Sequence, residues 1–191
     1  MNWSREASLT VPTPWGDVGY DRLRRPDGRT EGAAWADPRD AVVVVAVREG
    51  ANGGTADGES NDGEAADRGV VLIEEYRPKL RETVVTCPVG RLEDGESFEA
   101  GAARELREET GFDPATTRLL DVHYPVSWLR KRRGIVFATD LTPTAPDRDD
   151  GEFTDPRTVP ADEAVSRART TGPATGWTLG PLLLADHEGL L

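Results

Sequence analysis

The most constraining feature of this 191-residue chain is the run AVVVVAV at residues 41–47, seven apolar residues without a polar interruption. A strand that faces water on one side alternates apolar and polar residues, whereas an unbroken β-branched run is typical of a strand buried on both faces. Residues 69–76 repeat this pattern, and residues 83–87 form a shorter strand pattern that Pro88 ends. The sequence therefore predicts a sheet that other elements cover on both sides.

Helical patterns can supply that cover. The central helix is expected at residues 97–110, with Ser97 as its N-cap and Gly111 as the residue after its last turn. The remaining elements are expected at residues 118–124 and 134–141 as strands, and at residues 160–169 and 179–186 as helices. Because strands lie before and after one central helix, we expect an α/β fold with a mixed sheet between helices.

Two stretches lie outside this core pattern. Residues 8–25 carry two short strand patterns separated by turn residues, which predict a strand pair. Residues 1–40 are therefore expected to form an N-terminal strand extension to a main domain at residues 41–191. Residues 50–68 contain no large apolar side chain and cannot offset their ordering entropy by burial. We predict a disordered insertion there, at the tip of a hairpin, with a lid as the alternative.

The chain is strongly acidic, because 35 Asp and Glu against 23 Lys and Arg give a formal net charge of −12. This charge argues against nucleic-acid binding. It favours a solvated surface of the halophilic type, with recruitment of a basic partner as the alternative. Its lone cysteine, Cys87, excludes an internal disulfide and is expected to pack in the core. No apolar run is long enough to cross a bilayer, so we expect a cytoplasmic protein without a membrane partner.

Three glutamates of the central helix carry the chemistry. At 100° per residue, Glu105, Glu108 and Glu109 fall within about 100° of one another on one helix face. Like charges four residues apart cost about a few tenths of a kcal/mol. Carboxylates in the last turn cost about 0.3–1 kcal/mol. A hard divalent cation such as Mg²⁺ would remove both penalties. We therefore expect a metal site here, with Arg104 orienting Glu108; a solvated acidic face is the alternative.

The spacing around these glutamates is specific. The positions that match the Nudix box, G-x5-E-x7-R-E-U-x-E-E-x-G-U, are Gly90, Glu96, Arg104, Glu105, Leu106, Glu108, Glu109, Gly111 and Phe112. The chain thus resembles the Nudix hydrolases. The resemblance implies an α/β/α sandwich that cleaves a nucleoside diphosphate linked to another moiety, using Mg²⁺ or Mn²⁺. It also implies that Glu105, Glu108 and Glu109 bind the metal, that Arg104 orients them, and that Glu96 is an outer carboxylate.

The segments that flank the box resemble the ADP-ribose pyrophosphatases. EYRP at residues 75–78 is similar to their Q-Y-R-P, which implies a substrate contact for Arg77. TCPVG at residues 86–90 is similar to their E-L-P-A-G, which implies that the Val89 carbonyl binds metal beside Gly90. Glu75 and Thr86 depart from these two patterns, at the positions of Gln and Glu.

Two segments after the box complete the candidate site. The subfamily often takes its general base from a later loop glutamate, which makes Glu152 in the sequence DDGE the candidate; a solvated acidic loop is the alternative. Residues 130–133 form a basic segment, RKRR, close after Trp128. We expect Trp128 to stack on a base and Arg130 to contact phosphate or ribose; a hairpin whose cations balance the acidic surface is the alternative.

Together these residues predict Mg²⁺-dependent attack of water on the pyrophosphate bond of ADP-ribose or a related nucleotide sugar. The first alternative is a pyrophosphatase that sanitises nucleoside triphosphates. The second is a non-catalytic Nudix ligand-sensing or protein-binding module, against which the complete set of box carboxylates argues. The expected partner is a small-molecule nucleotide. The resemblance and the N-terminal strands also favour a homodimer.

Overall fold

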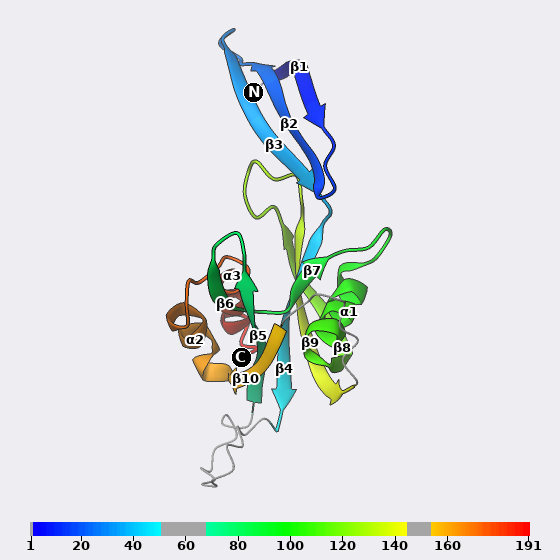
Figure 1. Cartoon of the computed structure of the whole chain (residues 1–191), viewed down its shortest axis with the longest axis vertical. Helices are drawn as coiled ribbons and strands as arrows, with labels where there is room; N and C mark the ends of the chain where they lie inside the picture. Colours follow the sequence, from blue (N-terminus) through cyan, green and yellow to red (C-terminus); the bar gives the residue numbers. More distant parts are fainter. Residues whose placement is uncertain (1, 51–67, 145–153) are drawn as a thin grey trace.

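The computed structural model describes residues 2–50, 68–144 and 154–191 (Figure 1). The chain begins with a three-stranded antiparallel sheet of β1 (Ser4–Val11), β2 (Gly16–Arg24) and β3 (Thr30–Pro38), which extends beyond the main body. The sequence predicts a strand pair at residues 8–25, and β3 is an additional strand outside that range. That strand, TEGAAWADP, has few β-branched residues, and its pairing with β2 holds it extended.

The main sheet has seven strands in the order β10-β5-β4-β9-β8, with β6 paired to β5 and β7 paired to β4. Its strands are β4 (Ala41–Glu49), β5 (Arg68–Arg77), β6 (Glu82–Thr86), β7 (Val89–Arg91), β8 (Phe112–His123), β9 (Arg133–Pro143) and β10 (Thr154–Pro160). β4 and β9 run parallel and the other paired strands run antiparallel. The predicted mixed sheet is therefore confirmed.

Helices cover both faces of this sheet, as the unbroken valine run requires. Alternate residues of β4 enter two cores: Val42 and Val44 pack on the side of α1 (Phe98–Thr110), while Val43 and Val45 pack on the opposite side. That opposite side carries a 3₁₀ turn at Ala161–Glu163, α2 (Ala164–Thr170) and α3 (Leu179–His187). The predicted α/β sandwich is confirmed. No helix in the described ranges is long and apolar enough to cross a membrane.

Helix α1 has the ends that its sequence predicts. The Ser97 hydroxyl accepts a hydrogen bond from the Ala100 N–H at 3.1 Å, and Gly111 takes a left-handed φ of 72° after the last turn. Because the chain turns at Gly111, β8 pairs with β9 from Phe112 onward, six residues earlier than expected.

The C-terminal expectations need two corrections. The helix expected at residues 160–169 begins only at Ala164, because the chain stays extended through Pro160, which pairs with Gly69, and then makes the 3₁₀ turn. Strand β10 was not predicted, since two prolines weaken its strand pattern; it lies at the edge of the sheet, where proline is tolerated. The predicted insertion falls almost wholly on residues 51–67, outside the described residues, although β4 and β5 form the expected antiparallel hairpin.

Candidate active site

Packing fixes the rotation of α1 and so places its glutamates. Ala102 and Leu106 are fully buried against β4 and its neighbours, which turns Glu105 and Glu109 toward the short strand β7. Both carboxylate residues are almost buried, at 7% and 5% exposure. Glu108, on the same helix, is partly exposed. The apolar residues of the helix thus decide which acids are withdrawn from water.

Strand β7 supplies a seat for each of the two buried glutamates. A Cβ atom at Gly90 would lie 1.8 Å from the carboxyl carbon of Glu105, so only glycine leaves room for that carboxylate. The N–H of Val89 donates to Oε2 of Glu109 at 2.8 Å. The glycine that opens the box and the residue before it therefore hold the acids of the helix in place.

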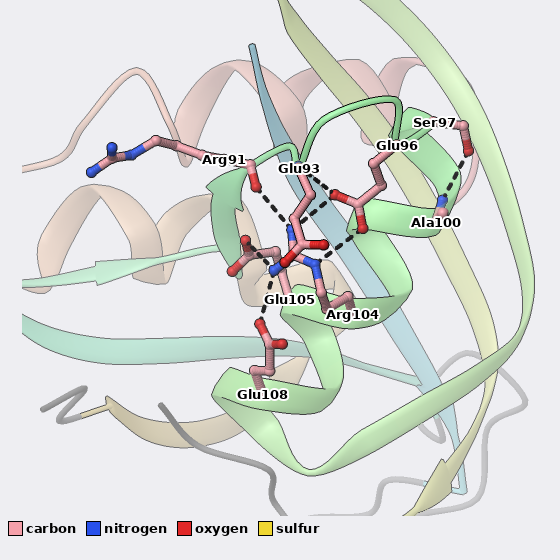
Figure 2. A network of polar contacts seen from close by, with 8 residues as sticks. All are labelled: Arg91, Glu93, Glu96, Ser97, Ala100, Arg104, Glu105 and Glu108. Carbon is pink, nitrogen blue, oxygen red and sulfur yellow. Dashed lines mark hydrogen bonds and ion pairs between the residues drawn. The ribbon is translucent and has the colours of Figure 1, made fainter. Parts of the chain in front are cut away.

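Arg104 joins three glutamates, buried Glu105 and the partly exposed Glu96 and Glu108, into one network, shown in Figure 2. Its Nη1 donates to Glu105 at 2.8 Å and to Glu108 at 2.9 Å. Its Nε and Nη2 donate to the two carboxylate oxygens of Glu96, each at 3.0 Å. Nη2 also donates to the Arg91 carbonyl at 2.8 Å. We call Glu96, Arg104, Glu105 and Glu108 the Arg104 cluster.

The electrostatics of the Arg104 cluster follow from this geometry. Hydrogen bonds from Arg104 lower the pKa of the Glu96 carboxyl below its ordinary value, against a smaller opposing effect of burial. The bond to Glu96 is also the largest of the contacts that raise the pKa of Arg104. The contact expected between Arg104 and Glu108 is present, and Glu96 forms a further ion pair with Arg104.

The residues proposed as metal ligands have the right chemistry for a hard divalent cation. Glu105, Glu108 and Glu109 offer carboxylate oxygens on one helix face. Because Gly90 has no side chain, it leaves space for the Glu105 carboxylate. Within the described ranges, no three His, Cys, Asp or Glu side chains are already gathered as a metal site. Arg104 instead provides the positive charge between Glu105 and Glu108. The donor set fits the metal, and its present arrangement is the one that Arg104 imposes.

The other predicted site residues are scattered over the chain. Glu152 lies outside the described residues. Arg77, at the end of β5, forms an ion pair with Glu75. Trp128 is 55% exposed in the connection from β8 to β9. Cys87 is buried, which raises the pKa of its thiol to about 12 and confirms a packing role.

Arg130 belongs to the junction with the N-terminal sheet. Its guanidinium stacks on Trp35 of β3 at 3.6 Å from the ring centroid and donates to Asp21 of β2 at 3.1 Å. The backbone of the same segment also meets β3, because the Ala36 N–H donates to the Trp128 carbonyl at 3.0 Å. The structure thus places Arg130 between two sheets, a position that sequence spacing did not reveal.

Comparison with known proteins identifies the family of this chain. The family model for the NUDIX domain matches residues 37–178, so the chain belongs to the Nudix family. Nudix hydrolases generally use divalent metal ions. A crystal structure of an ADP compounds hydrolase superposes with a TM-score of 0.78 at 19% identity, covering 100% of this chain and 98% of the other. That likeness shows a shared fold.

Three curated relatives match over shorter stretches. The chain is 31% identical over 93 residues to the methanol dehydrogenase activator of Bacillus methanolicus, covering 49% of this chain and 41% of that protein. It is 49% identical over 43 residues to the ADP-sugar pyrophosphatase of Mus musculus, covering 22% and 20%. It is 44% identical over 43 residues to the ADP-ribose pyrophosphatase of Bacillus subtilis, covering 22% and 23%. The chain therefore matches less than half of each relative's length.

Proposed function

We propose that this protein hydrolyses the pyrophosphate bond of ADP-ribose or a related ADP-sugar with the help of Mg²⁺. The observation that carries the proposal is the face of α1, where Glu105 and Glu109 are withdrawn from water beside Glu108. A solvated acidic face would leave all three exposed, and it would not need a glycine seat at residue 90. Two of the curated relatives are named for ADP-sugar and ADP-ribose hydrolysis, which supports this substrate class.

In this proposal Glu105, Glu108, Glu109 and the Val89 carbonyl would hold Mg²⁺, with Mn²⁺ as an alternative. The metal would neutralise the charge that develops on the pyrophosphate and polarise the attacking water. Arg104 acts through the ligands, because its hydrogen bonds to Glu105 and Glu108 fix their rotamers before substrate arrives. Glu96 in turn accepts from Arg104 and holds the guanidinium in place. The Val89 N–H fixes the rotamer of Glu109.

We keep Glu152 as the proposed general base and Arg77 and Trp128 as proposed substrate contacts. The exposed ring of Trp128 is available for stacking on a base. The Arg130 guanidinium already has Trp35 and Asp21 as partners, so its role in the proposal changes from a phosphate contact to fixing the loop that carries Trp128.

Glu152→Gln tests the base. The substitution keeps the shape of the side chain and removes its ability to accept a proton, so kcat should fall strongly while KM and the metal requirement stay near those of the wild type. Steady-state kinetics across pH provides the measurement. Wild-type turnover in the variant would place the base elsewhere and favour a glutamate of the box.

The substrate class is tested with the purified full-length chain, using ADP-ribose, an ADP-hexose and an oxidised deoxynucleoside triphosphate in parallel. Each is assayed with Mg²⁺, with Mn²⁺ and with a chelator, and the released nucleotide is measured. We expect AMP from the first two substrates and little product from the triphosphate. A preference for the triphosphate, with release of pyrophosphate, would overturn the substrate assignment in favour of nucleotide sanitising.

The proposal also includes a cytoplasmic location and a homodimer. Every residue of β1 is exposed, and the N-terminal sheet leaves Leu9, Val11 and Tyr20 open to solvent. Apolar side chains on a protruding sheet are suited to contact with a second copy. Light scattering on the purified chain tests the dimer, and a monomer at micromolar concentration would contradict it.

A further inference from the structure

The face of the sheet opposite α1 ends in three cations: Arg91 of β7, Lys131 of the β8–β9 connection and Arg133 of β9. We call them the Arg133 cluster. Arg91 and Arg133 flank Ala41 in one row across the sheet, because Ala41 pairs with both of them. Arg133 and Ile135 lie two residues apart on β9, so their side chains point to the same face of the sheet, the one on the side of α3.

The side-chain direction of Arg91 follows from its neighbour. Gly90 faces the Glu105 carboxylate, so alternation along β7 sends the adjacent Arg91 side chain to the other face. Figure 2 shows Arg91 extending away from Glu105 and Glu108. Only its backbone carbonyl contributes to the Arg104 cluster. Strand β7 therefore separates the side chains of the Arg133 cluster from the proposed carboxylate ligands on α1.

The environment of Arg133 is unusual for a cation. The residue is only 6% exposed, and its guanidinium lies over the ring of Trp177 at 3.4 Å from the centroid. It donates to the Gly176 carbonyl at 3.0 Å, while its buried Nε has no hydrogen-bond partner among the described residues. A buried cation with an unsatisfied donor is costly unless an anion completes its environment.

Lys131 adds a second cation over the same ring, with its Nζ at 4.9 Å from the Trp177 centroid. Partial burial, followed by the charges of Arg133 and Arg91, lowers the pKa of Lys131 to about 8. The like charges are thus close enough to oppose one another. Repulsion of this kind is relieved when a shared anion binds.

No Asp or Glu of the described residues forms an ion pair with Arg91, Lys131 or Arg133. Asp40 lies near Lys131, but Arg132 donates to both of its carboxylate oxygens, at 2.7 Å to Oδ1 and at 2.9 and 2.6 Å to Oδ2. The neighbouring cations of the basic segment, Arg130 and Arg132, do have acidic partners. In a chain with 35 acidic residues, charge balance explains those two arginines but leaves Lys131 and Arg133 unexplained.

We propose that Arg91, Lys131 and Arg133 form a phosphate-binding site, with the Trp177 ring as its apolar floor. Guanidinium groups match the geometry of phosphate oxygens, and two of them with an ammonium supply several charge-assisted donors. The ligand is a phosphate group, either free orthophosphate or the phosphate of a monoester. The site lies on the far side of β7 from Glu105 and does not depend on the proposed hydrolysis.

The test uses the full-length chain with a chelator present, so that no metal site contributes. Orthophosphate is titrated against chloride at constant ionic strength, and tryptophan fluorescence and the melting temperature are recorded. We expect a saturable change in both signals for phosphate. Lys131→Gln and Arg91→Gln, whose side chains are not deeply buried, should each weaken binding about tenfold. Arg118→Gln, an exposed arginine of β8, is the charge-matched control and should bind like the wild type.

Two further arms identify the source of the phosphate. AMP and ribose 5-phosphate are compared with adenosine and ribose. Tighter binding of the esters than of orthophosphate assigns the site to a phosphate monoester, and equal or weaker binding of the esters assigns it to orthophosphate. The proposal is overturned if phosphate gives no saturable signal. It is also overturned if Lys131→Gln and Arg91→Gln respond like Arg118→Gln. Because metal is absent from this experiment, neither result bears on hydrolysis.

Discussion

The two faces of strand β7 carry opposite charges and satisfy them in opposite ways. On the α1 face, the carboxylates of the Arg104 cluster surround one arginine that donates to three of them. On the α3 face, the cations of the Arg133 cluster have no acidic partner within the described residues. Like charges gathered in a fold need a counter-ion. The first cluster has a counter-ion in its own sequence, and the second needs one from solution.

This contrast separates internal charge balance from ligand binding. The protein can fold before any metal binds to the α1 face, because Arg104 already offsets much of the repulsion between Glu105 and Glu108. Metal binding then becomes an exchange of partners. The basic face has no such internal substitute, so its stability should respond directly to an added anion.

The largest expected effect is on turnover and concerns the acidic face. Glu108→Gln and Glu109→Gln keep the side-chain shape and remove a proposed metal ligand, so each should lower kcat by about a hundredfold or more. Melting temperatures without metal should change little for Glu108→Gln, because Arg104 retains Glu96 and Glu105.

Glu99→Gln, a glutamate in the first turn of the same helix, is the control and should keep full activity. Activity assays at saturating Mg²⁺ provide the comparison. Wild-type turnover in either Glu108→Gln or Glu109→Gln would remove that residue from the metal site.

The next largest effect is on stability. It follows from removal of Arg104, the counter-ion of the carboxylates in the Arg104 cluster. Arg104→Gln leaves Glu96, Glu105 and Glu108 without their shared donor, so the free energy of unfolding should fall by about 2–4 kcal/mol. Added Mg²⁺ should restore more stability in this variant than in the wild type. Urea unfolding with and without Mg²⁺ measures both, and equal stabilisation of the two proteins by Mg²⁺ would contradict the exchange of partners.

Removal of a cation from the Arg133 cluster should change the free energy of unfolding in the opposite direction. Lys131 has a pKa of about 8 in the fold and 10.5 as its ordinary value, so charging it opposes folding at neutral pH. Lys131→Gln should therefore raise the free energy of unfolding, by about 1 kcal/mol after allowance for partial exposure.

The stabilisation expected for Lys131→Gln should depend on pH. Between about pH 8 and 10.5 the unfolded wild type binds the proton that the folded protein has lost, so wild-type stability rises with pH across that window. The advantage of Lys131→Gln should accordingly disappear by the upper end. Urea unfolding at pH 7 and pH 10 in phosphate-free buffer measures it. A destabilised variant at pH 7 would show that Lys131 has a counter-ion within the fold.

The smallest expected effect is the dependence of the melting temperature on salt, which involves the charge of the whole surface. With a net charge of −12, surface carboxylates repel one another at 0.1 M salt, where the screening length is about 10 Å, and much less at 1 M, where it is about 3 Å. Melting temperature should rise from 0.1 to 3 M KCl. Flat or falling stability would argue against a halophilic surface and favour recruitment of a basic partner.

Local signals made much of the acidic face predictable. Ser97, Gly111 and the spacing of the glutamates lie within one short segment, and a helix converts that spacing directly into a shared face. The valine run of β4 likewise predicted a strand buried on both sides. β3 and β10 were missed because their extended shape comes from pairing with neighbours rather than from their own residues.

The basic segment shows what a sequence leaves open. Four consecutive cations at residues 130–133 look alike, yet Arg130 pairs with Asp21, Arg132 pairs with Asp40, and Lys131 and Arg133 lie over Trp177. Each assignment depends on partners that are distant along the chain; Arg132 and Asp40 are 92 positions apart. No local spacing rule could distinguish them.

The sequence by itself therefore determined the helix, its caps and the row of carboxylates, because i, i+3 and i+4 neighbours are set by helical geometry alone. Tertiary structure decided which acids are buried, that Gly90 makes room for the Glu105 carboxylate, and that Arg91 and Arg133 flank Ala41 on the same face of the sheet. The physical reason is alternation in a sheet. Consecutive residues of β7 point to opposite faces, and only the packing of α1 and α3 decides what each face meets.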